Sequence, residues 1–95
     1  MSSNMHTDHV TKQYYTISEL AKELKIHTSQ LRFYEQVGVI KASGRTRRGE
    51  RKYKKENADR IRLVIRCARS KYYTLNGLRY IYSTGELPSV FQTNI

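Results

Sequence analysis

Apolar side chains recur at the three- and four-residue spacing of amphipathic helices in four separate stretches of this sequence. The first stretch follows the run Thr-Ile-Ser-Glu at residues 16–19, which is typical of a capping box. In that arrangement the Thr16 hydroxyl accepts from the Glu19 N–H, and the Glu19 carboxylate accepts from the Thr16 N–H. The apolar positions at helical spacing are Ile17, Leu20, Ala21 and Leu24. The pattern predicts a first helix of about two turns.

A second apolar stretch begins after only three residues, 25–27, so we expect two short helices joined by a tight turn. Its inward positions are Leu31, Tyr34 and Val37. Such a pair is typical of a helix-turn-helix motif. The second helix begins with Thr28, Ser29 and Gln30, whose side chains suit both capping and contact with base edges. Gly38 is expected to end it, because glycine takes a left-handed backbone without steric cost.

A compact basic element is expected over residues 39–53. It contains the run RTRRGERKY at residues 45–53, which has five Lys or Arg in nine positions. A solvated basic loop would have the same composition. However, Gly49 interrupts the charges, and Ile40 and Tyr53 flank them as apolar anchors. The pattern therefore predicts a small two-stranded hairpin with its tip near Gly49.

Two further helices are predicted after the hairpin. The third begins near residue 57, ends near Ser70 and has a continuous apolar face. That face is formed by Ile61, Val64, Ile65 and Ala68. Thr74 can cap the fourth, and Gly85 and Pro88 are expected to stop it. Its inward positions are Leu75, Leu78, Ile81 and Tyr82.

The order of these elements predicts a mainly α fold, a winged helix-turn-helix of four short helices with a small two-stranded wing. The chain has room for one small domain. We place that domain at residues 15–83. We expect residues 1–14 to be a flexible polar tail, since they offer little to bury. Residues 84–95 are expected to be a C-terminal tail or the start of a missing region.

The net charge of +10 is concentrated in one third of the chain. Residues 41–71 hold thirteen Lys or Arg against three Asp or Glu, which accounts for the whole imbalance. A contiguous basic surface is typical of proteins that bind polyanions. Nucleic acid is the first candidate, and an anionic membrane surface is the second. The sequence shows neither a membrane-spanning apolar run nor a signal peptide, so we expect a cytoplasmic protein.

The sequence offers no convincing chemistry for an enzyme, a cofactor or a metal. It contains no persuasive nucleophile and base pair and no phosphate-cradling glycine loop. Cys67 is the single cysteine, and its apolar neighbourhood favours a buried structural thiol. His6 and His9 lie in a polar segment, where this spacing alone rarely marks a metal site.

Several ordered motifs resemble the DNA-binding domain of the mercury-resistance regulator (MerR) family. The resemblance covers about residues 14–82. The first helix carries Thr16, Ile17, Glu19, Leu20 and Ala21, and the second carries Leu31, Arg32, Phe33, Tyr34 and Glu35. The run Gly38, Val39 and Ile40 follows, and the wing carries Arg45, Thr46, Gly49, Arg51 and Tyr53. The amino-acid sequence of the wing, RTRRGERKY, and the position of His27 most resemble those of the heat-shock repressor branch.

The chain also departs from the family pattern. Lys25 stands where the family usually has Gly, so a left-handed Lys would cost ~1 kcal/mol. Tyr72 replaces another usual Gly before the fourth helix. The long dimerisation helix, the effector domain and the metal-binding cysteines of typical members have no counterpart in this sequence. We therefore expect no metal sensing and no effector site.

The resemblance implies a DNA-binding transcription regulator, with a recognition helix at about residues 28–36 in the major groove and the wing on phosphates. It implies double-stranded DNA as the partner, a two-fold symmetric operator bound by a homodimer, and a bacterial, nucleoid-associated location. Gln30 can pair with adenine and Arg32 with guanine. The full set of expected DNA contacts is Thr16, Thr28, Ser29, Gln30, Arg32, Phe33, Tyr34, Arg45, Arg47, Arg48, Arg51 and Tyr53.

Three side-chain roles follow from the same comparison. Leu31 is expected to be core rather than contact. Glu35 is expected to bridge to a wing arginine. One or two of the third-helix arginines are expected to reach phosphate. These arginines are Arg60, Arg62, Arg66 and Arg69.

Two other functions remain open from the sequence. An excisionase-like or architectural accessory protein would use the same domain to bend DNA without regulating a promoter. A basic RNA-binding or protein-interaction module would share the charge but not the preference for duplex DNA. Competition between duplex DNA and structured RNA distinguishes the last of these from the others.

Overall fold

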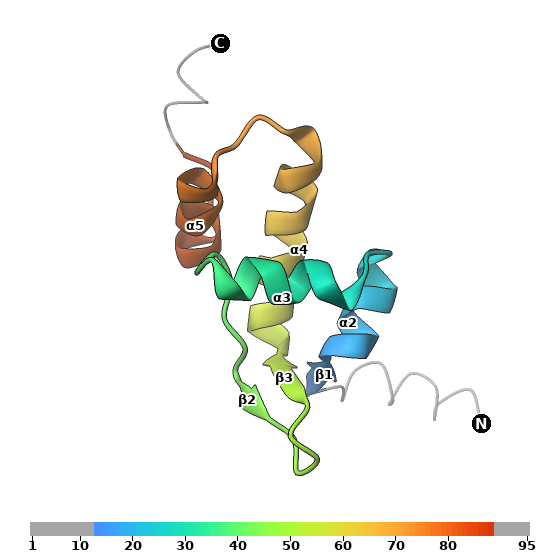
Figure 1. The fold of residues 1–95 in the computed structure, drawn as a ribbon. Coiled ribbons are helices and arrows are strands. Elements are labelled where there is room, and N and C mark those ends of the chain that lie inside the picture. Colours follow the sequence, from blue (N-terminus) through green and yellow to red (C-terminus); the bar gives the residue numbers. More distant parts are fainter. Residues whose placement is uncertain (1–12, 89–95) are drawn as a thin grey trace, which may run out of the picture.

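The computed structural model describes residues 13–88, and Figure 1 shows their arrangement. The tails were predicted at residues 1–14 and 84–95, and their outer parts, residues 1–12 and 89–95, lie outside the described residues. The four predicted helices are present, and a small sheet lies at one end of them (Figure 1). In chain order the elements are β1 (Tyr14–Thr16), α2 (Ile17–Leu24), α3 (Thr28–Gln36), β2 (Gly44–Arg45), β3 (Arg51–Lys54), α4 (Lys55–Ser70) and α5 (Leu75–Thr84).

The sheet has three antiparallel strands in the order β1-β3-β2, so the prediction of a two-stranded wing was incomplete. The extra strand β1 pairs Tyr15 with Tyr53 and Tyr14 with Lys54. Tyrosine and threonine are favoured in strands, and pairing satisfies backbone groups that a polar tail would leave to water. Tyr14 therefore belongs to the sheet, although we had expected it to lie in the tail.

The predicted caps begin α2 and α5. At α2, the Thr16 hydroxyl accepts from the Glu19 N–H at 3.2 Å, and the Glu19 carboxylate accepts from the Thr16 N–H at 3.0 Å. At α5, the Thr74 hydroxyl accepts from the Gly77 N–H at 3.1 Å. Each contact satisfies an N–H that the first helical turn leaves without a partner.

Left-handed residues end most of the helices. Lys25 has φ of 60° at the end of α2, as the missing glycine in the family pattern implied. Gly38 has φ of 81° after α3, which confirms its predicted role. After α4, the left-handed residue is Lys71, with φ of 62°, and not Tyr72. The strain therefore falls one residue earlier than the departure at Tyr72 suggested.

The core lies where α2, α3, α4, α5 and the sheet meet. It is continuous across the whole domain, and its largest fully buried side chains come from every layer. These are Tyr53, Leu20, Leu31, Ile61, Ile81, Val39 and Val64. The buried position of Leu31 confirms its core role. Cys67 is also buried, and burial raises the pKa of its thiol, which fits an inert structural residue.

The helices form a body from which the hairpin projects (Figure 1). α4 packs against α5, and α2 packs against α3. In the view of Figure 1, α3 crosses in front of α4, and the loop between β2 and β3 extends furthest from the helices. α3 and the wing are thus separate elements built on one core.

Candidate nucleic-acid interface

The first turns of α3 present polar side chains to solvent. Ser29, Gln30 and Arg32 are exposed, whereas Leu31 between them points into the core. The Gln30 side-chain oxygen accepts from the His27 N–H at 3.3 Å, and Arg32 Nη1 donates to the Thr28 hydroxyl at 3.2 Å. The predicted contact residues therefore also organise the helix start, which limits their rotamers before any ligand arrives.

The two aromatic residues of α3 differ in exposure. Phe33 is 49% exposed, whereas Tyr34 is half-buried and packs against the core cluster. Their rings meet edge to face with centroids 5.5 Å apart. Phe33 thus offers an apolar surface beside the polar face of α3, and Tyr34 fixes the ring next to it.

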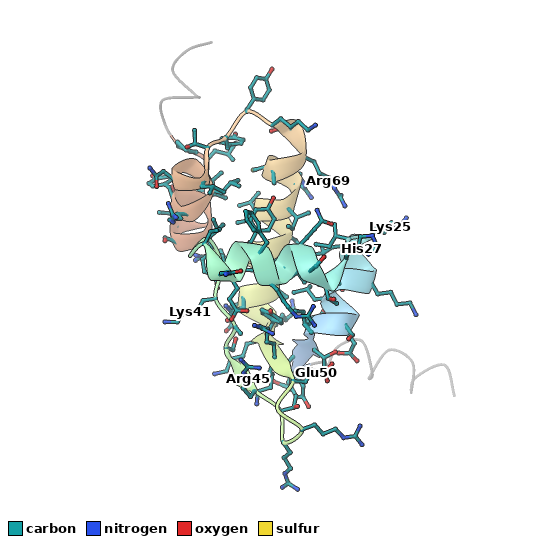
Figure 2. All side chains as sticks on the ribbon, viewed as in Figure 1. Lys25, His27, Lys41, Arg45, Glu50 and Arg69 are labelled. Atoms are coloured by element: carbon teal, nitrogen blue, oxygen red, sulfur yellow. The ribbon has the colours of Figure 1, made fainter. Side chains whose placement is uncertain are left out.

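The wing tip is a tight turn that holds its arginines outward. The Thr46 N–H donates to the Glu50 carbonyl at 2.8 Å, and the Gly49 N–H donates back to the Thr46 carbonyl at 2.9 Å. Gly49 has φ of 85°, which favours glycine at the tip. Arg47 and Arg48 are exposed. Figure 2 shows that the basic side chains at the tip point away from the body.

The remaining two wing arginines are held by the protein itself. Arg45 Nη1 donates to the Gly49 carbonyl at 2.9 Å, which braces the turn while leaving the residue exposed. Arg51 forms an ion pair through Nε with Glu35 of α3. The Arg51 side chain is only 25% exposed. The predicted bridge from Glu35 to a wing arginine is confirmed, and its partner is Arg51.

Tyr53 does not contribute an accessible contact, so its place among the predicted DNA contacts is corrected. Its side chain has no solvent exposure, because the alternation along β3 directs it into the core between the sheet and the helices. Its hydroxyl has no hydrogen-bond partner among residues 13–88. Burial and the nearby Glu35 carboxylate raise the pKa of Tyr53 to about 12.

Three of the four arginines on α4 tie the helices together. Arg60 Nη1 donates to the carbonyls of Tyr82 and Ser83 at 2.7 and 2.9 Å. Arg62 pairs with Glu23 and Asp59, and hydrogen bonding to Glu23 raises its pKa further. Their companion Arg69 donates to the Leu24 carbonyl at 2.6 Å. Arg66 is exposed, as is Arg69, whereas Arg60 and Arg62 are half-buried.

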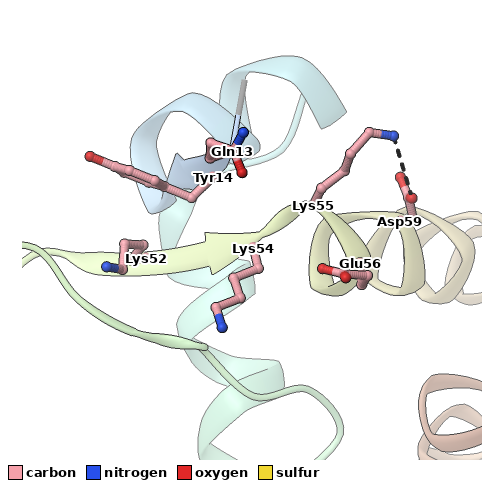
Figure 3. A pocket seen from close by; sticks show the side chains of 7 residues that line it. All are labelled: Gln13, Tyr14, Lys52, Lys54, Lys55, Glu56 and Asp59. Atoms are coloured by element: carbon pink, nitrogen blue, oxygen red, sulfur yellow. Dashed lines mark ion pairs between the residues drawn. The ribbon is translucent and has the colours of Figure 1, made fainter. Parts of the chain in front are cut away.

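The outer face of the sheet carries a basic pocket that the sequence interpretation missed (Figure 3). Strand alternation turns Lys52 and Lys54 to the side opposite Tyr53. Lys52 Nζ lies 5.2 Å from the centre of the Tyr14 ring. The pocket has a volume of about 550 Å³. Its lining residues are Gln13, Tyr14, Lys52, Lys54, Lys55, Glu56 and Asp59. The alternation of side chains along residues 51–54 would indicate this face in the sequence, but only if a strand were already assigned there.

Residues 13–88 contain neither a cluster of metal ligands nor a membrane-spanning helix. Within that range, no group of three or more His, Cys, Asp or Glu residues is placed to hold a metal ion. No helix in the same range is long and apolar enough to cross a membrane.

The four helices, the three-stranded sheet and the projecting hairpin define a winged helix-turn-helix protein. Residues 15–83 match the family described as MerR HTH family regulatory protein, and the chain belongs to this family. The mercuric resistance operon regulatory protein of Bacillus cereus is 32% identical over 62 residues. That match covers 65% of this chain and 46% of the relative, so the chain spans about half the relative's length.

Two solved structures have the same fold. A MerR family transcriptional regulator from Bacillus cereus matches with a TM-score of 0.68 and 23% identity, over 85% of this chain and 60% of that one. HiNmlR, a MerR family regulator lacking the sensor domain, bound to promoter DNA, matches with a TM-score of 0.65 and 22% identity. The second match covers 84% of this chain and 66% of HiNmlR.

Proposed function

We propose that the chain is a sequence-specific regulator that binds duplex DNA, with α3 in the major groove and the wing on phosphates. The observation that carries this proposal is the pairing of two exposed surfaces on one core. Ser29, Gln30 and Arg32 project from α3, and Arg47 and Arg48 project from the wing tip. A helix that reads base edges beside a basic hairpin suits a groove and its flanking backbone.

The two surfaces have different tasks in this proposal. Gln30 can form two hydrogen bonds with an adenine edge, and Arg32 can do so with a guanine edge. Arg45, Arg47 and Arg48 contact phosphates, which sets affinity and register without reading sequence. Thr16 and Thr28 add hydroxyl contacts at the starts of α2 and α3, and Phe33 packs against the DNA surface.

Arg51 and Tyr34 act indirectly in this proposal, since both side chains are largely held by the protein. The regulator acts in the bacterial cytoplasm on the nucleoid. It binds a two-fold symmetric operator as a homodimer, because symmetric half-sites match a symmetric pair of recognition helices. The solved structure of HiNmlR, which is bound to promoter DNA, supports a promoter as the target. Deformation of that promoter would supply part of the specificity.

Selection from random duplex DNA tests the sequence-specific part of the proposal. The expected result is a palindromic site, which would establish base readout and dimeric binding together. Tight binding with no preferred site, combined with measurable bending of the duplex, would instead support the architectural accessory function. A preference for structured RNA in direct competition would contradict both DNA-binding proposals.

Salt titration tests the electrostatic part. If each protomer neutralises about six phosphates, affinity should fall by ~10³ between 50 and 200 mM salt. A flat response would contradict the proposed phosphate contacts.

Two single substitutions separate base readout from phosphate contact. Arg47→Ala is expected to weaken binding to all sequences and to lower the salt slope by about 0.9. Arg32→Ala is expected to weaken binding to the selected site most, by about 1–3 kcal/mol, and to relax the preference at one base pair. Equal losses on selected and random DNA for both variants would contradict the assignment of Arg32 to base contact.

A further inference from the structure

Two side chains one turn apart on α5 hold the segment that joins the recognition helix to the wing. We call residues 37–43 the joining segment. Arg79 Nη2 donates to the Val37 carbonyl at 2.6 Å, just after the end of α3. The Tyr82 hydroxyl donates to the Lys41 carbonyl at 3.0 Å, just before the wing. One face of α5 thus contacts both ends of the connection.

Asn57 extends this contact from α5 to the base of the wing. Its side-chain nitrogen donates to the Lys41 carbonyl at 2.9 Å and to the Tyr82 hydroxyl oxygen at 2.5 Å. Its side-chain oxygen accepts from the Ser43 hydroxyl at 2.5 Å. The Ser43 hydroxyl in turn accepts from the Lys54 N–H at 2.9 Å. Both side-chain N–H groups of Asn57 are therefore used and its oxygen accepts one bond, and the chain of bonds ends on β3.

The joining segment depends on these side chains because it has little regular structure. The Val39 and Ile40 N–H groups donate to the Tyr34 carbonyl, which fixes the α3 end. The Ser43 N–H donates to the Lys52 carbonyl, which fixes the wing end. Between them, the Lys41 carbonyl is held by Tyr82 and Asn57. A fully satisfied polar network of this kind restricts a segment to one geometry.

We propose that Tyr82 and Asn57 are positioning residues for DNA binding, because they fix the wing relative to the recognition helix. The inference rests on the proposed function. When the network is intact, the wing arginines reach phosphates while α3 occupies the groove. When it is cut, the β2 side of the wing is held less firmly, because β3 stays anchored by its pairing with β1 and by the buried Tyr53, and the phosphate contacts of the wing weaken.

The positioning step is tested first in the free protein, where no DNA is needed. Tyr82→Phe removes the hydroxyl and keeps the ring, and Ser43→Ala cuts the network at its other end. Both variants are expected to raise amide hydrogen exchange across residues 43–54 by about fivefold or more, while α4 core amides are unchanged. Tyr80→Phe is the matched control, because the Tyr80 hydroxyl has no hydrogen-bond partner within residues 13–88 and its ring is 44% exposed.

The consequence for DNA is tested by combining Tyr82→Phe with Arg47→Ala. Tyr82→Phe alone is expected to weaken duplex binding about five- to tenfold, as the loss of one hydrogen bond implies, and to lower the salt slope. In the Tyr82→Phe background, Arg47→Ala should then cause a smaller further loss than in the wild type, because the phosphate contacts of the wing are already weakened. Tyr80→Phe should leave the Arg47→Ala effect unchanged.

The outcomes separate this inference from the proposed function. Unchanged exchange in the wing of both Tyr82→Phe and Ser43→Ala would overturn the positioning role, even if the wild type binds DNA tightly. Full additivity of Tyr82→Phe and Arg47→Ala would overturn the link to DNA, because a merely stabilising hydroxyl leaves the arginine effect intact. If Tyr82→Phe and Ser43→Ala raise exchange in the wing but the wild type binds no duplex DNA, the proposed function is overturned and the positioning role stands.

Discussion

Glu35 of α3 and Arg51 of β3 form an ion pair that joins α3 directly to the wing. Both side chains are about three-quarters shielded, with 24% and 25% of their surface exposed. A second set of contacts comes from Asn57 of α4, which accepts from the Ser43 hydroxyl, and from Tyr82 of α5, which donates to the Lys41 carbonyl. The wing and the joining segment are therefore held to α3 by a charge pair and to α4 and α5 by neutral hydrogen bonds.

The Glu35–Arg51 pair should contribute measurably to stability because it is partly shielded from water. A double-mutant cycle with Glu35→Ala and Arg51→Ala is expected to give a coupling free energy of about 0.5–1 kcal/mol in urea unfolding. The control is the Lys55–Asp59 pair, which is 4.0 Å apart and more than half exposed on both sides. Its coupling should be near zero, and a larger value there than at Glu35–Arg51 would contradict the argument from shielding.

The buried hydroxyl of Tyr53 should cost stability, because it has no hydrogen-bond partner within residues 13–88. Tyr53→Phe keeps the ring in the core and removes that hydroxyl. We expect the free energy of unfolding to rise by about 1 kcal/mol at neutral pH, as measured by urea titration. If Tyr53→Phe instead lowered the free energy of unfolding by more than about 1 kcal/mol, the hydroxyl would have a hydrogen-bond partner in solution.

Tyr53 also predicts a loss of stability at high pH. Its pKa is raised from 10.0 to about 12 in the folded protein, so folding favours the neutral phenol. The stabilisation is complete below pH 10 and is lost as pH rises from 10 to 12, because the unfolded chain releases the proton first. Up to about 2 kcal/mol should be lost over that range. The difference in stability between wild type and Tyr53→Phe should grow there, and a constant difference would contradict the assignment.

Gly85 should tolerate substitution less well than Gly49, although both have a left-handed backbone, with φ of 76° and 85°. A Cβ at Gly85 would lie 2.8 Å from Arg60 Nε, whereas a Cβ at Gly49 would meet nothing within 4 Å. Arg60 also caps the carbonyls at the end of α5, so it is not free to move. We expect Gly49→Ala to cost about 1 kcal/mol and Gly85→Ala about 2 kcal/mol or more in thermal or urea unfolding. Equal costs would show that Arg60 gives way easily.

The position of strain at the end of α4 can be tested with glycine. Lys71 is left-handed and Tyr72 is not. Lys71→Gly is therefore expected to raise stability by up to about 1 kcal/mol, because it relieves the steric cost of Cβ. Tyr72→Gly is expected to lower it slightly, because glycine makes the unfolded chain more flexible. If Tyr72→Gly raised the free energy of unfolding in urea and Lys71→Gly lowered it, the strained residue would be Tyr72.

The local structure could be predicted because its causes are local. The capping box at residues 16–19, the cap at Thr74 and the stop at Gly38 depend on side chains within a few residues of the backbone groups they satisfy. Apolar periodicity placed Leu31 and Ile61 in the core for the same reason. Gly49 and the charged residues around it predicted a turn exposed to solvent at the tip of the wing. The ordered motifs of the family further indicated how these elements follow one another.

The roles of individual polar side chains depended on the tertiary structure, because their partners are distant in sequence. The sequence by itself determined four helices, a basic wing and a surface suited to a polyanion. It could not show that β1 completes the sheet or that Tyr53 is inside it. Nor could it show that Arg60 donates to carbonyls of α5 and that Arg62 pairs with Glu23 of α2. The hydrogen bond from Tyr82 to the joining segment was equally hidden. Hydrogen bonds and burial across the fold decide which charges remain accessible, and these contacts exist only once the elements have packed.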